Sequence, residues 1–336
     1  MRLLALLLYR WLFILQRTQK VKGFTLLELL ISLVIASLVM AGLLYGVVEL
    51  TSIDRRETIV DQVQRDMSRA MEYITDDLKE AVYVYTNPQQ IAVQLTSDPS
   101  FPDNTGEIPV LAFWRVDPIE EGLPADCSIG TTDFQEQCQL LMIRQAAYTL
   151  VVYSQKVNDG NTNWPGQSRL VRYELSMYSD LNNLTIRPGY RDPTDPDDPL
   201  AGFDNWNANG IPDGSSAVLV DYVQAPSFTP PATLNRAPLS DTDGPCRGYG
   251  LDSNNNPLYS VVPNTSTVTV NNTFFACVRN PTLDTGVIGS QDVYLFLRGN
   301  VQSTSGGIRS FSDETSLPIL ETQVLVKGVV NKGFRQ

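Results

Sequence analysis

The spacing of apolar residues divides the first quarter of the chain into two parts. Residues 24–48 are predominantly apolar, and Glu28 is the only charged residue among them. A run of about 20 apolar residues is long enough to cross a bilayer as a helix. Beyond it, apolar residues recur at intervals of three and four with charges between them, which indicates an amphipathic helix. Those apolar positions are Val60, Val63, Met67, Ala70, Met71, Ile74, Leu78, Ala81 and Val82.

Together the two parts predict one helix from Phe24 to about Tyr83, which at 1.5 Å per residue is on the order of 90 Å long. The pair Asn87-Pro88 ends it, because proline cannot continue the helical hydrogen bonds. Gly42 and Gly46 lie near the junction of the two halves. They allow either local bending or melting during assembly or close packing of helices, and the sequence leaves both interpretations open.

After this helix the chain consists of short segments rich in β-branched and aromatic residues, separated by polar stretches. An antiparallel sheet packed on the amphipathic stripe would bury them, so the predicted fold class is α+β, with a β-rich head of one large domain or two lobes. The expected strands are residues 91–95, 110–116, 140–155 (a hairpin or a bent strand), 169–177, 217–223, 267–270, 274–279, 293–298 and 319–330. The expected surface excursions are residues 97–109, 187–216 and 226–257.

The position of Glu28 is the most informative feature of the apolar run. A carboxylate inside a membrane costs on the order of 2.5 to 3.5 kcal/mol at a helix centre and less near an end, so it indicates a function. A cut between Gly23 and Phe24 would create an α-amino group about one helical turn before Glu28. Within one chain that pairing is awkward, but between neighbouring subunits it would neutralise both charges in lipid. The pattern therefore predicts a subunit that polymerises through its membrane helix.

An ordinary secretory signal or a simple membrane anchor is the competing interpretation. A secretory signal needs an apolar core of about 7 to 15 residues followed by a small-residue cleavage site. The run here is about twice that length, and its small-residue candidates around Ala36 and Ala41 lie inside it. A simple anchor fits the length but leaves Glu28 and the Gly-Phe junction unexplained.

Basic residues precede the apolar run, and no acid does. By the positive-inside rule they hold the leader in the cytoplasm, so the head is expected to be extracytoplasmic on a single-pass inner-membrane protein. The apolar stretch 3–15 within the leader is too short to span a bilayer. The expected organisation is a cleaved leader (1–23), a transmembrane half (24–52), an amphipathic half (53–86) and the head (87–336). The basic residues are Arg2, Arg10, Arg17, Lys20 and Lys22.

The residues Lys22, Gly23, Phe24 and Glu28 resemble, position by position, the signal of the type IV prepilin and pseudopilin family. The resemblance implies cleavage after Gly23 by a prepilin peptidase, N-methylation of Phe24, and a role of Glu28 in pairing between subunits and extraction from the membrane. It also implies several partners, which are other pilins or pseudopilins, the peptidase, an inner-membrane assembly platform and membrane lipid. Assembly into a periplasmic or surface pilus-like fibre is expected.

Scattered pieces of the chain carry a narrower resemblance. Residues 71–81, 169–175 and 218–223 are similar to the large minor pilins and the J-type pseudopilins of protein secretion machines. Residues 80–85 and 109–115 are similar to the cyanobacterial hormogonium polysaccharide secretion pseudopilins. This similarity implies a low-abundance subunit at or near the tip of a fibre that supports polysaccharide export and gliding, and a type II protein secretion pseudopilin is the alternative. A rival from another class is a membrane-anchored carbohydrate-binding adhesin that uses Trp114, Trp164 and Trp206.

Charge and composition disfavour a nucleic-acid-binding protein and an enzyme. Without the five leader bases, 20 Lys and Arg face 37 acids, a net charge of −17. Such a surface disfavours nucleic acid as a partner. The chain has no histidine, the commonest general base. The adjacent acids Asp76-Asp77 and Glu120-Glu121 are typical of a solvated face, because neighbours on a helix diverge by about 100°. We therefore expect a protein that is not an enzyme.

Four cysteines follow the membrane segment, namely Cys127, Cys138, Cys246 and Cys277. An extracytoplasmic location permits disulfides, and three pairings are possible. The scheme that joins the near neighbours, Cys127 with Cys138 and Cys246 with Cys277, closes the shortest loops and is favoured. Zinc is disfavoured, because there is neither a CxxC pair nor a histidine.

One polar loop resembles a calcium loop in its spacing. Asn205, Asn207, Asn209 and Asp213 supply oxygen atoms at positions 1, 3, 5 and 9 around Gly210. The first three carry no charge, so weak calcium binding is one hypothesis. A polar turn held by asparagine side chains is the alternative. No other cofactor is expected.

Overall fold

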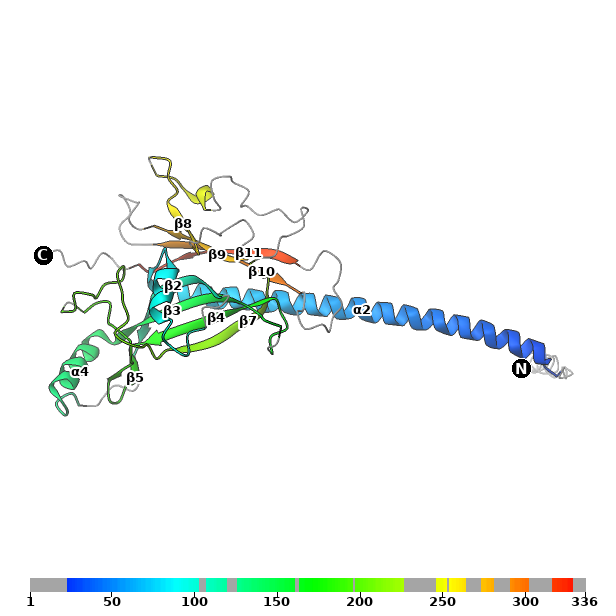
Figure 1. Cartoon of the computed structure of the whole chain (residues 1–336), viewed down its shortest axis with the longest axis horizontal. Coiled ribbons are helices and arrows are strands. Elements are labelled where there is room, and N and C mark those ends of the chain that lie inside the picture. The colour runs from blue at the N-terminus through cyan, green and yellow to red at the C-terminus, as the bar shows by residue number, and fades with distance from the viewer. Residues whose placement is uncertain are drawn as a thin grey trace, which may run out of the picture. The chain divides into compact units, whose positions relative to one another are not determined.

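The computed structural model describes residues 23–102, 107–119, 126–160, 163–195, 197–226, 246–252, 254–263, 273–280, 291–301 and 316–328. The chain divides into two units, Met1–Thr58 and Ile59–Gln336, which are treated separately below. Helix α2 (Leu26–Lys79) contributes to both (Figure 1). A long helix followed by an antiparallel sheet confirms the predicted α+β class.

The end of α2 differs from the prediction. The helix stops at Lys79, and Ala81–Val84 forms strand β1, so the expected continuation to about Tyr83 is wrong. β-Branched and aromatic residues favour a strand when a neighbouring strand is available, and β1 pairs with β2 (Glu107–Pro118). Pro88 begins a second helix instead of ending the first. It occupies the first turn of α3 (Pro88–Leu95), where its missing N–H is tolerated.

The sheet in the second unit has nine strands in the order β1-β2-β3-β4-β7-β10-β9-β8, with β11 also paired to β10 (Figure 1). Every pairing is antiparallel. Strands β5 (Tyr178–Asp180) and β6 (Thr185–Ile186) form a separate hairpin. The other strands are β3 (Ala146–Val157), β4 (Ser168–Ser176), β7 (Ser215–Val223), β8 (Tyr259–Val262), β9 (Phe274–Arg279), β10 (Asp292–Asn300) and β11 (Ser316–Leu325).

Most expected strands are confirmed, and two are wrong. Residues 91–95 lie in helix α3, and residues 140–144 are the end of helix α4 (Thr132–Arg144) rather than the start of a strand. Thr131 caps α4 by accepting a hydrogen bond from the Phe134 N–H, and Gln145 ends it in a left-handed conformation (φ 48°). The strand expected at 319–330 runs instead over β11, and residues 267–270 lie outside the described part of the chain.

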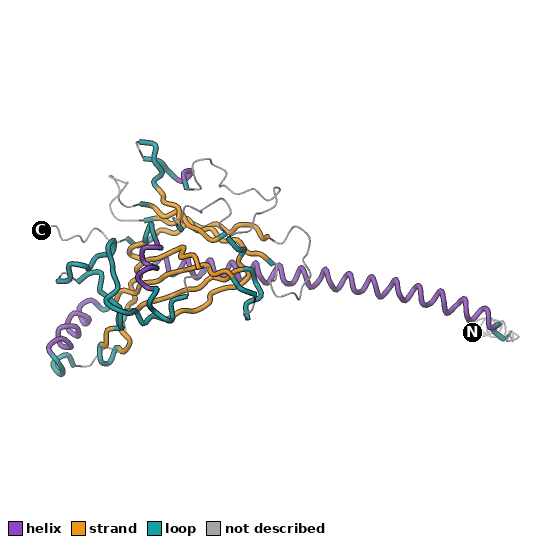
Figure 2. Tube along the Cα trace, viewed as in Figure 1, coloured by secondary structure: helices purple, strands orange, loops and turns teal. Residues whose placement is uncertain are grey.

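The sheet consists of two halves that both pack on α2. Strands β1, β2, β3, β4 and β7 form one half, and β8, β9, β10 and β11 form the other (Figure 2). Strands β7 and β10 pair at Gly299↔Val223. The core between the halves contains the predicted amphipathic stripe of α2, now seen as Val63, Met67, Ala70, Met71, Ile74 and Leu78.

Contacts at the two ends of β10 hold it against α2 and against the first half of the sheet. At its end, Gly299 passes close to α2, where an added Cβ would lie 3.0 Å from Met67 Cγ. Just before its start, the side-chain amide of Gln291 accepts from the Val84 N–H and donates to the Val84 carbonyl, both at 2.9 Å. This amide occupies the place of a strand partner for β1, so β10 is tied to both β7 and β1 across the core.

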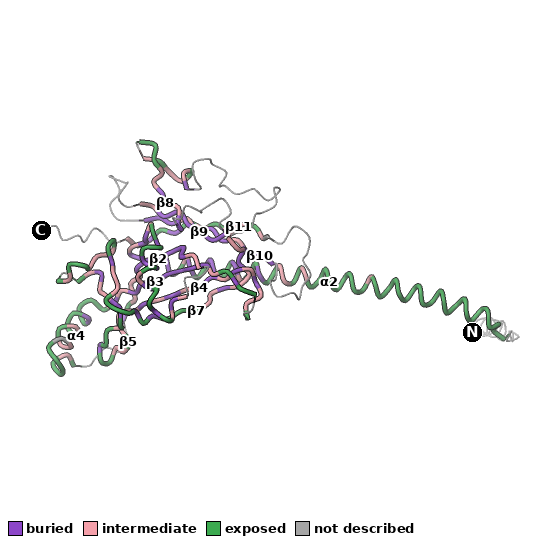
Figure 3. Tube along the Cα trace, in the orientation of Figure 1, coloured by how far each residue is buried: buried purple, intermediate pink, exposed green. Residues whose placement is uncertain are grey.

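The first half of the sheet is covered on its second face as well. In β2, Leu111 and Phe113 face α2, whereas Ala112 and Trp114 belong to a separate core cluster. Helix α3 contributes Ile91 and Leu95 to that cluster, and the segment 187–216 contributes Tyr190 and Trp206. The segment 187–216 lies mostly at the surface, as expected, but it also buries Tyr190 and Trp206 against this face of the sheet (Figure 3). A sheet that is apolar on both faces needs cover on both.

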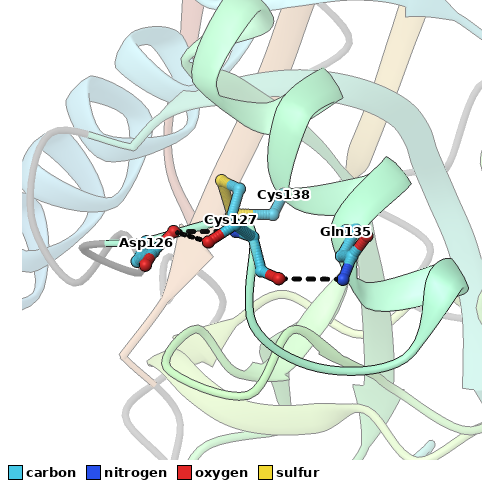
Figure 4. Close-up of a disulfide and its surroundings, with 5 residues drawn as sticks. Asp126, Cys127, Gln135 and Cys138 are labelled. Atoms are coloured by element: carbon cyan, nitrogen blue, oxygen red, sulfur yellow. Dashed lines mark hydrogen bonds between the residues drawn. A yellow bond between two sulfur atoms is a disulfide. The ribbon is translucent and has the colours of Figure 1, made fainter.

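Both disulfides join near neighbours in sequence, which is the favoured scheme. Cys127 pairs with Cys138, fixing the loop before α4 to that helix (Figure 4). Gln135 of α4 also donates to the Ser128 carbonyl of this loop at 3.0 Å. Cys246 pairs with Cys277 of β9 and, with Phe275 and Phe296, covers the outer face of the second half.

Candidate functional site

The first turn of α2 contains the residues that the sequence assigns to processing and assembly. Gly23 and Phe24 precede the helix, and Phe24 is 76% exposed. The Glu28 N–H donates to the Thr25 carbonyl at 3.0 Å and to Thr25 Oγ1 at 3.3 Å. Thr25 therefore caps the helix, and Glu28 occupies the third helical position. The spacing Thr-x-x-Glu is that of a capping box, a signal that the sequence analysis missed.

Among the described residues, none forms a hydrogen bond or an ion pair with the carboxylate of Glu28. At a helix N-terminus the backbone dipole and the free N–H groups favour negative charge, typically by about 0.3 to 1 kcal/mol. In water this stabilisation is enough for an ionised carboxylate. In lipid a carboxylate also needs a counter-charge. The geometry leaves the Glu28 carboxylate open to a cation supplied by another molecule.

The apolar part of α2 exposes its side chains throughout the first unit. Leu26, Leu33 and Leu38 are each more than 60% exposed. The hydroxyl groups of Ser32 and Ser37 donate to carbonyls one turn earlier, at Leu29 and Val34, so their polar atoms are satisfied within the helix. In the described part of the chain α2 is the one helix long and apolar enough to cross a membrane. It fits a single-pass membrane anchor.

Gly42 and Gly46 lie within the continuous helix. An added Cβ at either position would meet no atom within 4 Å. Neither residue is therefore required by packing against the described part of the chain. Bending and close packing against another helix both stay hypotheses.

A buried charge network fixes the far end of α2 to the sheet. Asp77, 7% exposed, accepts hydrogen bonds from Arg115 Nη1 at 2.5 Å, Tyr153 Oη at 2.5 Å and Arg172 Nε at 2.7 Å. These partners lie on β2, β3 and β4. Burial, followed by the charge of Asp77, raises the pKa of Tyr153.

The adjacent acids Asp76 and Asp77 diverge on the helix, as expected, but only one is solvated. Asp76 is exposed and pairs with Lys79 at 2.8 Å, whereas Asp77 is buried. The sequence analysis missed the role of Asp77, because its partners are distant in sequence. Glu120 and Glu121 lie outside the described residues.

The loop with calcium-like spacing is folded as a polar turn against the body of the head. The Asn207 amide donates to the Asn205 carbonyl at 3.1 Å, and the backbones of Asn209 and Asp213 pair with residues 189 and 188. Within the described ranges no three Asp, Glu, His or Cys side chains form a group that could hold a metal ion. The local bonds are those of the alternative interpretation, and calcium binding stays a hypothesis.

The tryptophans proposed for carbohydrate stacking are largely unavailable. Trp114 is 0% exposed and donates to the Tyr85 hydroxyl, and Trp206 is 1% exposed and donates to the Arg191 carbonyl. Trp164 is half-buried beneath the guanidinium of Arg169, 5.8 Å from its ring centroid. The structure thus gives no support to an adhesin that uses these rings.

Comparison with protein-family models gives a match that includes the first turn of α2. A family model described as the prokaryotic N-terminal methylation motif matches residues 18–44, which include Gly23, Phe24, Thr25 and Glu28. No curated protein and no solved structure matches the chain. The motif supports a type IV pilin-like protein that is processed by a prepilin peptidase and interacts with other pilins.

Proposed function

We propose that this protein is a structural minor pilin or pseudopilin with no catalytic role of its own. A prepilin peptidase cuts it between Gly23 and Phe24, Phe24 is then N-methylated, and the subunit enters a pilus-like fibre through α2. The observation that carries this proposal is the Glu28 carboxylate, which lies without a described partner in the first turn of an exposed apolar helix inside the methylation motif.

The cut supplies the missing cation. It creates an α-amino group at Phe24, and the amine of one subunit pairs with Glu28 of the next, which neutralises both charges and fixes the axial stagger between the two helices. Lipid covers the apolar side chains of α2 before assembly, and neighbouring helices cover them afterwards. The inner-membrane assembly platform is the expected site of that transfer, with the leader cytoplasmic and the head extracytoplasmic.

The size of the head favours a subunit at the tip or at intervals along the shaft, because a unit such as Ile59–Gln336 would crowd a tightly packed fibre. The similarity of residues 80–85 and 109–115 to hormogonium pseudopilins supports a role in polysaccharide secretion and gliding. A type II protein secretion system would use the same helix, and it is the alternative setting.

The test compares Glu28→Val with Glu49→Val, which removes a carboxylate from the same helix beyond the first turn. We expect Glu28→Val to be cut normally but to be lost from the sheared fibre fraction, and Glu49→Val to be retained. Immunoblots of membrane and fibre fractions measure both. Equal incorporation of the two variants would contradict the proposed pairing.

A further inference from the structure

The nine-stranded sheet has three edge strands, β1, β8 and β11, and within the described ranges each pairs with a single strand. Strand β1 has four residues, and the Gln291 amide occupies the free side of Val84. Strand β8 also has four residues. Strand β11, drawn in red in Figure 1, has ten. It is therefore the long edge of the sheet.

The hydrogen bonds of β10 show which backbone groups of β11 reach this edge. The Arg298 N–H donates to the Thr273 carbonyl at 2.8 Å, and the Arg298 carbonyl accepts from the Gln224 N–H at 3.1 Å. Both groups of Arg298 thus point away from β11. Ile319 lies opposite Arg298, so its own N–H and carbonyl point away from β10, toward the free edge.

The other end of β11 shows the same alternation. The Val326 N–H, just beyond the strand, donates to the Gln291 carbonyl at 2.9 Å, so the even-numbered residues bond to β10. The pairing has no irregularity between residues 319 and 325. No described residue bonds to the outward backbone groups. The residues that present them are Ile319, Glu321, Gln323 and Leu325.

This part of β11 lacks the features that usually protect an edge strand. Natural edges are protected by shortness, by lysine or proline, or by a bulge. Pro318 lies near the start of β11, but residues 319–325 contain neither lysine nor proline, and Glu321 is their only charged residue. The Glu321 carboxylate accepts from the Tyr249 hydroxyl at 2.8 Å, and Leu325 is 67% exposed. The edge is open to an added strand.

The direction of β11 limits which strand can be added. Gln291, just before β10, contacts Val84 beyond the end of α2, whereas Gly299 near the end of β10 lies beside Met67. Strand β10 therefore runs back along α2, and β11 runs in the direction of α2. An antiparallel pair of two β11 strands would point their α2 helices in opposite directions, so two copies anchored in one membrane cannot form it. Strand β8 of a second copy has the required direction, but its four residues cover less than half of the ten in β11.

We propose that β11 receives an extended strand from a different fibre subunit that is anchored in the same orientation. The donated strand runs antiparallel to β11 along residues 319–325 and places apolar side chains opposite Ile319 and Leu325. Its backbone satisfies the outward groups of β11, which supplies affinity, and its side chains supply specificity. This inference rests on the proposed function, because it needs neighbouring subunits in a fibre.

Hydrogen exchange of single amides tests the inference on the unmodified processed protein, in detergent and in sheared fibres. In detergent we expect fast exchange at Glu321 and Gln323 and slow exchange at Thr322 and Val324, which bond to β10. In fibres the exchange at Glu321 and Gln323 should slow by about tenfold or more. Fast exchange at these two amides in fibres overturns this inference and leaves the proposed function standing. Absence of the protein from fibres overturns both.

Gln323→Pro and Gln323→Ala form a matched pair of variants. Both lose the glutamine side chain, but only proline removes the outward N–H and places its ring on the free edge. We expect about tenfold less Gln323→Pro than Gln323→Ala in the fibre fraction, and equal amounts would overturn the inference. The exchange measurement uses the unmodified chain, so it decides the question even if the proline variant folds poorly.

A bifunctional maleimide on Gln323→Cys identifies the neighbour. The four native cysteines are held in disulfides, so the introduced thiol is the reactive one. A cross-linked product that contains a different pilin-type subunit supports the inference. A product that contains two copies of this chain overturns it.

Discussion

Replacing Asp77 by alanine tests how the long helix is held to the sheet. The change leaves Arg115 and Arg172, with side chains 17% and 12% exposed, without their shared carboxylate. Removing one partner of a buried ion pair costs about 3 to 5 kcal/mol. Each arginine keeps one other acid, Asp117 at 2.6 Å and Glu174 at 2.5 Å, so we expect a loss of about 2 to 3 kcal/mol in the free energy of unfolding.

Urea unfolding of the full chain in detergent, followed by the fluorescence of the buried Trp114 and Trp206, measures this loss. Asp76→Ala is the matched control, because Asp76 lies one residue away but is exposed and pairs with the exposed Lys79. We expect the control to change the stability by less than about 0.5 kcal/mol. Equal midpoints for the two variants would refute the view that Asp77 anchors α2.

Three further results are expected. Gln291→Leu removes the amide that hydrogen-bonds to both the N–H and the carbonyl of Val84. The free energy of unfolding should fall by about 1 to 3 kcal/mol, and hydrogen exchange of the peptide containing Val84 should become faster. Unchanged exchange would contradict the bridging role of Gln291. Burial, and then the charge of Asp204, raises the pKa of Tyr83 to about 12. The contribution of the neutral Tyr83 side chain to the free energy of unfolding is therefore complete below about pH 10 and is lost as the pH rises through 12. Urea midpoints recorded with tyrosinate absorbance should show this fall, and a flat profile would disprove it. If the 205–213 loop binds calcium, calorimetric titration of the full chain should show weak binding that Asp213→Asn abolishes, and the absence of heat at millimolar calcium would remove the hypothesis.

The parts of the fold that depend on local pattern could be predicted from the sequence. The apolar stripe from Val63 to Leu78 has helical spacing, and the strand over Phe274–Arg279 is rich in apolar and aromatic residues, so both follow from the chain itself. The errors arose where a partner outside the segment decided the structure. Residues 81–84 became a strand because β2 lies beside them, and residues 140–144 stayed helical in a segment that a disulfide fixes to its preceding loop.

The candidate functional residues also divide into those that the sequence could predict and those that it could not. Gly23, Phe24 and Glu28 lie close together in sequence, and their pattern alone indicated processing and assembly. The Asp77 network brings together residues from a helix and three separate strands. No spacing rule relates such residues, so only the folded arrangement reveals them.

The most direct test of the central claim is the intact mass and N-terminal sequence of the protein from membranes of cells with and without the prepilin peptidase. The account predicts a mature chain that begins at methylated Phe24 and that is found only when the peptidase is present. A chain that starts at Met1 in both strains, or one cut beyond the apolar run, would contradict assignment to the pilin pathway.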